Sequence, residues 1–154
     1  MKKATIFGLV ALMLLPLLAL GCGTAKSAEQ TVPPVNGGQQ AKTIEIATDD
    51  FAAQNDITRD IELVVPGSLI ITLGANPTTG FSWGEAEISD ASVVAQDSHN
   101  YVEPQSDAVG APGKDVWVFD SKAPGSATIK MSYGRPWEGG EQDEWTLTIN
   151  VTVK

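Results

Sequence analysis

The chain is poor in the residues that most often carry chemistry, because its 154 residues include one cysteine, Cys22, and one histidine, His99. A single cysteine excludes an intramolecular disulfide, so a stable domain must rely on its core. No pattern marks a serine as a nucleophile. Ser98-His99 lies in a stretch typical of a polar loop, where a histidine is usually solvated. We therefore predict no enzyme, no catalytic residue and no cofactor.

Basic residues are also scarce, with ten Lys and Arg against nineteen Asp and Glu and a net charge of −9. Without Lys2 and Lys3, which precede an apolar leader, the net charge becomes −11. Nucleic-acid binding requires clustered cations that replace condensed counterions, so a nucleic-acid partner is disfavoured. Direct adsorption on anionic lipid is disfavoured for the same reason. An acidic surface most often serves solubility, although it also steers a basic partner.

The N-terminus reads as a secretory signal. Lys2 and Lys3 precede the apolar run 4–20, which is short for a membrane span, so residues 1–21 are predicted to be a signal peptide. Ala19-Leu20-Gly21-Cys22 resembles a bacterial lipobox, which implies lipidation of Cys22 and a protein exported and lipid-anchored to the bacterial cell envelope. Cys22 would then be the membrane contact. The alternative is an ordinary signal peptide that leaves Cys22 as a spent or free thiol.

Residues 22–42 contain the lipidation site and a Gln-, Gly-, Pro-, Ser- and Ala-rich stretch without periodicity, which predicts a flexible linker. Residues 43–154 are the size of one domain. Apolar residues in this domain alternate with polar ones, most clearly in 145–153. We expect one all-β domain and a monomer.

The same alternation predicts further strands, and Ile61, Leu63 and Val65 are expected to face inward in one of them. The expected strands are 60–65, 69–73, 81–88, 92–96, 114–120, 126–133 and 145–153, with 43–48 as a candidate edge strand. Turn signals recur about every ten residues, and no amphipathic helix is convincing. This pattern predicts an immunoglobulin-like antiparallel β-sandwich of seven or eight strands. A small barrel is the alternative.

Three loops have a composition unusual for a generic sandwich. The first is Asn76-Pro77-Thr78-Thr79-Gly80-Phe81, in which Pro77 restricts the backbone and Gly80 supplies the positive φ that closes a turn. The second is Val109-Gly110-Ala111-Pro112-Gly113. The third contains Arg135-Pro136-Trp137.

These motifs, in this order, resemble those of the chagasin family of cysteine protease inhibitors, and the resemblance covers about 63–153. It implies that the three loops meet at one end of the sandwich and bind the active-site cleft of a papain-family cysteine protease. The loop that holds Thr78 and Thr79 would enter the cleft beside the catalytic cysteine. The other two would hold its flanks. Pro112, between Gly110 and Gly113, departs from the more glycine-rich family pattern and is expected to narrow the conformations of that loop.

A loop stiffened by Pro77 does not readily adopt the extended pose of a substrate, so inhibition is expected to be reversible and without cleavage. An exposed Trp137 next to Arg135 has the composition of a binding hot spot. Whether Arg135 contacts the protease or braces its own loop is open. Core or scaffold positions are expected for the aromatic residues Phe81, Trp83, Trp117 and Trp145.

Three other interpretations of the sequence can be compared with this one. Glu138, Glu141, Asp143 and Glu144 surround Gly139-Gly140, but their spacing is not that of an EF-hand, so a solvated acidic loop is favoured and no metal is predicted. Nothing selects a carboxylate pair for glycoside hydrolysis. The alternative function is an envelope binding or scaffolding module that recognises another protein or a glycan.

Overall fold

The computed structural model describes residues 40–106, 108 and 110–154, all of which belong to the compact unit Pro33–Lys154. The predicted signal peptide, Cys22 and nearly all of the predicted linker lie outside the described residues. Among those described, the elements in chain order are β1 Gln40–Ile46, α1 Thr48–Ala53, β2 Asp56–Leu63, β3 Gly67–Ala75, the 3-10 turn η1 Pro77–Thr79, β4 Ser82–Trp83, β5 Glu87–Ile88, β6 Val94–Val102, β7 Gly113–Ser121, β8 Gly125–Gly134 and β9 Trp145–Val153.

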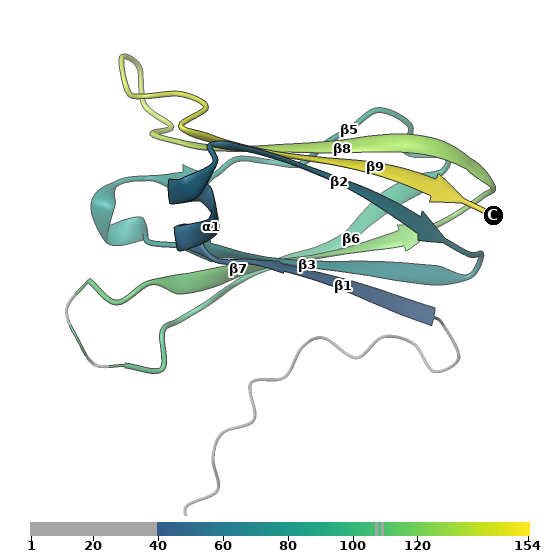
Figure 1. Cartoon of the computed structure of the whole chain (residues 1–154), viewed down its shortest axis with the longest axis horizontal. Helices are drawn as coiled ribbons and strands as arrows, with labels where there is room; N and C mark the ends of the chain where they lie inside the picture. Colours follow the sequence, from purple (N-terminus) through teal and green to yellow (C-terminus); the bar gives the residue numbers. More distant parts are fainter. Residues whose placement is uncertain (1–39, 107, 109) are drawn as a thin grey trace, which may run out of the picture. The chain divides into compact units, whose positions relative to one another are not determined.

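The strands form two sheets that face each other, as Figure 1 shows. One sheet has the order β1-β3-β7-β6, and the other has the order β2-β9-β8-β4 with β5 also paired to β8. The pairs β1/β3 and β2/β9 are parallel, and the remaining pairs are antiparallel. The predicted immunoglobulin-like sandwich is confirmed, and the barrel alternative is wrong because two separate sheets are present.

The core lies between the two sheets and follows the predicted alternation. In β9, Leu147, Ile149, Val151 and Val153 are buried, and in β8 every second residue from Ala127 to Tyr133 is buried. Strands β3 and β7 are buried almost continuously, because Ile70, Val116 and Val118 form a second small cluster outside the main core. Trp83 and Trp117 belong to the core, as expected.

Several elements differ from the sequence prediction. The expected strand 81–88 is two short strands, β4 and β5, and the expected strand 92–96 continues to Val102 past a bulge. Val65 was expected inward but is exposed, because β2 ends at Leu63 and Pro66 has no N–H for a ladder.

Helix α1 was not expected. Its first turn is acidic, and the Asp50 carboxylate accepts a hydrogen bond from the Ala47 backbone N–H at 2.9 Å, which satisfies an otherwise unpaired donor at the helix start. Phe51, the one buried residue of this helix, has no exposed surface and packs into the core. Six residues are too few for a periodic pattern, so the helix depends on this packing. No helix in the described part of the chain has the length and apolar character needed to cross a membrane.

Candidate functional site

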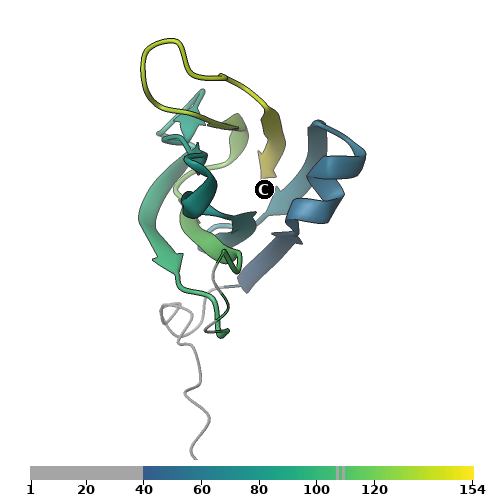
Figure 2. The same cartoon turned by 90° about the vertical axis from the view of Figure 1, so that its left-hand side faces the viewer.

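The three predicted loops lie at one end of the sandwich. We define the first loop as residues 76–81, the second as 103–112, of which 107 and 109 are not described, and the third as 135–144. They occupy the left-hand end of the domain in Figure 1, the end that faces the viewer in Figure 2. The register explains part of this arrangement, since Ala75 pairs with Gly113 in one sheet and Tyr133 pairs with Trp145 in the other.

The first loop is held by hydrogen bonds within itself. The Thr79 N–H donates to the Asn76 carbonyl at 3.1 Å, and the Gly80 N–H donates to the Pro77 carbonyl at 3.0 Å. The Thr78 hydroxyl donates to the Asn76 side-chain oxygen at 2.6 Å. Gly80 has φ +81°, so the predicted positive φ is confirmed. The tip of the loop is therefore ordered in a 3-10 turn while Pro77, Thr78 and Thr79 stay exposed.

Hydrogen bonding and side-chain packing connect the loops to one another. The Asn76 side-chain amide donates to the Gly110 carbonyl at 3.0 Å, which joins the first loop to the second. Trp137 of the third loop packs on Gly80, where an added Cβ would lie 2.7 Å from Cη2 of the indole. The Asn76 backbone N–H also donates to the Tyr133 hydroxyl of the opposite sheet at 3.2 Å. The structure thus makes one continuous surface from three segments far apart in the sequence.

Trp137 is exposed and Arg135 is not simply solvated. Trp137 is 51% exposed, in agreement with its predicted place on the surface. The guanidinium carbon of Arg135 lies 4.4 Å from the centroid of Phe81 and 5.9 Å from that of Trp137. Arg135 Nη1 also donates to the Glu141 carboxylate at 3.1 Å. These contacts support the bracing role, since they join the third loop to the first, and contact of Arg135 with a protease stays a prediction.

The second loop is only partly a surface loop. Gly110 has φ +82° and open space around a hypothetical Cβ, and the Ala111 N–H donates to the Ala108 carbonyl at 3.1 Å. Pro112 is exposed. Gly113, predicted to belong to the loop, is the buried first residue of β7 and packs so closely on Tyr101 that a side chain would clash with its hydroxyl.

A stack of aromatic rings supports the first and third loops. Phe81 stacks on Tyr133 with centroids 5.6 Å apart, Tyr133 on Trp145 at 4.6 Å, and Trp145 on Phe51 of α1 at 5.3 Å. The Arg135 guanidinium also lies over the Phe81 ring. The expected scaffold roles of Phe81 and Trp145 are confirmed. Sequence reasoning missed the supporting roles of Tyr133 and Phe51, because each strand or helix shows its own pattern but not its partner across the sandwich.

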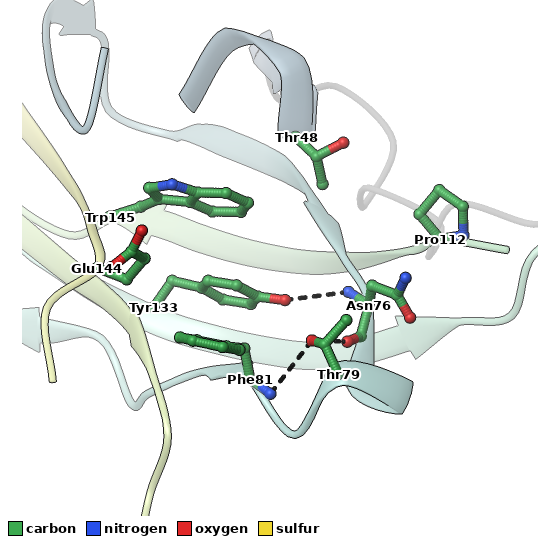
Figure 3. A pocket seen from close by; sticks show the side chains of 8 residues that line it. All are labelled: Thr48, Asn76, Thr79, Phe81, Pro112, Tyr133, Glu144 and Trp145. Carbon is green, nitrogen blue, oxygen red and sulfur yellow. Dashed lines mark hydrogen bonds between the residues drawn. The ribbon is translucent and has the colours of Figure 1, made fainter. Parts of the chain in front are cut away.

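A hollow of about 340 Å³ opens between the loops (Figure 3). Its lining consists of three stacked aromatic residues, parts of the first and second loops, one helix residue and one carboxylate: Phe81, Tyr133, Trp145, Asn76, Thr79, Pro112, Thr48 and Glu144. Thr48 and Glu144 were not predicted as lining residues. No local signal could have found them, since they come from α1 and from the end of the third loop.

His99 was expected in a polar loop, but it lies in β6. Its ring stacks on Trp117 with centroids 4.2 Å apart and its Nε2 lies 2.8 Å from an Asp115 carboxylate oxygen. Burial raises the pKa of Asp115, and the hydrogen bond from His99 partly offsets that rise. Ser98 and His99 pair with different residues of β7, Val118 and Trp117, so their side chains point to opposite faces of the sheet. The pair is not arranged as a nucleophile and its base.

The acidic residues of the third loop do not converge. Within the described residues, no group of three or more His, Cys, Asp or Glu side chains could hold a metal ion. Glu141 pairs instead with Arg135. Glu141 thus stiffens the third loop from within.

Fold and site together define a β-sandwich with three adjoining loops at one end. A family model described as "Chagasin family peptidase inhibitor I42" matches residues 63–151. Chagasin of Trypanosoma cruzi is 34% identical over 91 residues, which cover 56% of this chain and 82% of that protein. Amoebiasin-2 of Entamoeba histolytica is 33% identical over 85 residues, covering 54% of this chain and 68% of that protein.

Solved structures support the fold. The cysteine protease inhibitor EhICP2 of Entamoeba histolytica superimposes with a TM-score of 0.61 at 22% identity, covering 77% of this chain and all of that one. PbICP-C, solved in complex with falcipain-2, gives a TM-score of 0.54 at 20% identity, covering 75% of this chain and 99% of that one. The chain belongs to the chagasin family of peptidase inhibitors. It is an inhibitor and not an enzyme.

Proposed function

We propose that the protein is a reversible, uncleaved inhibitor of papain-like cysteine proteases. The first loop fills the active-site cleft, and the second and third loops hold its flanks. The observation that carries this proposal is the contact of all three loops at one end of a chagasin-family domain, through Asn76 with Gly110 and through Gly80 with Trp137. The complex of a related fold with falcipain-2 supports the same class of target.

The conformation of the first loop supports inhibition without cleavage. Residues Pro77–Thr79 form a 3-10 turn rather than an extended strand, and internal hydrogen bonds keep them there. A peptide bond in this turn is not presented to a catalytic cysteine as a substrate would be. Because the loop is ordered before binding, the complex also avoids about 0.5–1.5 kcal/mol per immobilised side chain.

Residual activity of papain and of cathepsin L against increasing concentrations of the full chain in detergent tests this function. We expect stoichiometric, reversible inhibition and no cleaved inhibitor on a gel. Thr78→Arg places bulk and charge at the loop tip and should abolish inhibition, whereas Thr152→Arg, on an exposed position of β9, should leave it unchanged. Trp137→Ala should weaken binding by about 2 kcal/mol, roughly 30-fold. Full inhibition by folded Thr78→Arg and Trp137→Ala variants would contradict binding through the three loops. No inhibition of either enzyme by the wild-type chain would favour the envelope binding module.

We further propose that the protein is exported and anchored to the bacterial cell envelope through lipid on Cys22. The sequence motif that supports this lies outside the described residues. Strand β1 offers a compatible geometry, because Gln40 pairs with Gly67 at the start of β3 while Ala75, at its other end, leads into the first loop. Eight residue steps of about 3.3 Å separate these ends. A tether attached before Gln40 would leave the three loops free for a protease.

Labelling with a palmitate analogue in a bacterial host tests the anchor. The wild-type chain should incorporate label and partition into detergent, and Cys22→Ser should do neither. Label retained by Cys22→Ser would contradict lipidation at this residue. Protease inhibition by the same variant in detergent should be unchanged, since Cys22 belongs to none of the three loops.

A further inference from the structure

The hollow between the loops lies within the proposed protease-binding surface. Asn76 and Thr79 of the first loop and Pro112 of the second border it, so a protease that fills its cleft with the first loop must also cover this hollow. In Figure 3, Phe81, Tyr133 and Trp145 lie one above another along one side, with Thr48, Asn76 and Pro112 across from them. The inference below rests on the proposed function and asks what part of the protease enters the hollow.

The aromatic side of the hollow consists of ring edges. Tyr133 is sandwiched between Phe81 and Trp145, with interplanar angles of 19° and 8°, and Trp145 stacks in turn on Phe51. The flat faces of Tyr133 and Trp145 are therefore covered within the protein. What remains for a ligand is an apolar wall suited to an aliphatic chain, without a free ring face for a cation–π contact.

The polar groups around the hollow are mostly engaged inside the protein. The Tyr133 hydroxyl accepts a hydrogen bond from the Asn76 N–H, the Asn76 amide donates to Gly110, and the Thr79 hydroxyl donates to the Asn76 carbonyl at 2.7 Å. Glu144 is different. It is the one charged residue in the lining, and none of the ion pairs between described residues includes it.

We propose that the hollow receives a lysine or arginine side chain from the rim of the protease cleft. The aliphatic part of this side chain lies along the ring edges, and its charged end reaches the Glu144 carboxylate. Long basic side chains combine these two properties, an apolar stem and a cationic head. A purely apolar side chain would cover Glu144 without compensating its charge, and an acidic one would be repelled. The inhibitor would then prefer papain-like proteases with a basic residue at this position.

A double-mutant cycle tests the pairing. The inhibitor variants are Glu144→Gln and, as the matched control, Glu87→Gln, which makes the same change of charge at an exposed position of β5 outside the three loops. The probes are papain and cathepsin L, each with single alanine substitutions at every Lys and Arg that borders the cleft. All Ki values are measured at low and at high salt, with the full inhibitor chain in detergent.

We expect Glu144→Gln to raise Ki about tenfold at low salt and less at high salt, with Glu87→Gln changing it less than threefold. The effect of Glu144→Gln should disappear against one protease variant, the one that lacks the basic partner. If the wild-type chain inhibits both enzymes but no cleft residue couples to Glu144, the proposal is wrong and another occupant fills the hollow. If the wild-type chain inhibits neither enzyme, the proposed function itself fails.

Discussion

Replacement of Gly80 by alanine tests whether the contact between the first and third loops is needed for inhibition. Two costs can be worked out from the structure. Gly80 has φ +81°, a left-handed conformation that costs an L-residue roughly 1–2 kcal/mol. In addition, the new Cβ would lie 2.7 Å from Cη2 of Trp137, so the indole must move by about 1 Å to restore ordinary contact near 4 Å. Only the second cost displaces the proposed anchor.

Gly139→Ala provides the matched control, because Gly139 has φ +77° but open space around its Cβ. In urea unfolding both variants should lose the cost of the left-handed conformation, and Gly80→Ala should in addition lose the cost of displacing the indole. In papain inhibition we expect Gly80→Ala to raise Ki about tenfold, below the roughly 30-fold limit set by complete loss of Trp137. Gly139→Ala should stay within about threefold of the wild-type chain.

The double variant Gly80→Ala/Trp137→Ala separates the two costs. Without the indole, the added methyl group meets no ring, so the double variant should bind papain no more weakly than Trp137→Ala alone. The reasoning is refuted if Gly80→Ala inhibits as well as Gly139→Ala. It is equally refuted if Gly80→Ala raises Ki by the same factor with and without Trp137.

Three further predictions concern the scaffold. Tyr133→Phe removes the hydroxyl that accepts the Asn76 N–H and should cost about 1 kcal/mol of unfolding free energy in urea titrations. A smaller loss in a Pro77→Ala background would show that the hydroxyl stabilises the fold through the first loop. Phe51→Ala should cost about 3–5 kcal/mol, and a cost below 1 kcal/mol would show that α1 does not support the core. Burial raises the pKa of Asp115, so the folded state keeps this proton to a higher pH than the unfolded state and loses stability as pH rises through that interval. Asp115→Asn should therefore gain stability relative to the wild-type chain as pH rises from about 4 in urea titrations, and a pH-independent difference would contradict this.

Most of the fold could be predicted from the sequence, because each half-buried strand carries its own period-two pattern. Strands β8 and β9 follow that pattern closely. The pattern fails where burial is not one-sided or where the element is short. The six residues of α1 carry no readable period, and β4 and β5 are paired only over two residues each. His99 looked like a loop residue because its strand lies at a sheet edge, where polar residues are frequent.

The sequence by itself determined the turn at Gly80, the stiff first loop and the exposed position of Trp137, because neighbouring residues control backbone conformation and turn chemistry is local. It also indicated the family through the order of its motifs. Only the tertiary structure decided that Arg135 braces Phe81, that Tyr133 holds Asn76, and that Glu144 lies beside the ring stack. These contacts join residues far apart in the chain. They depend on strand register and on the packing of two sheets, which no local pattern specifies.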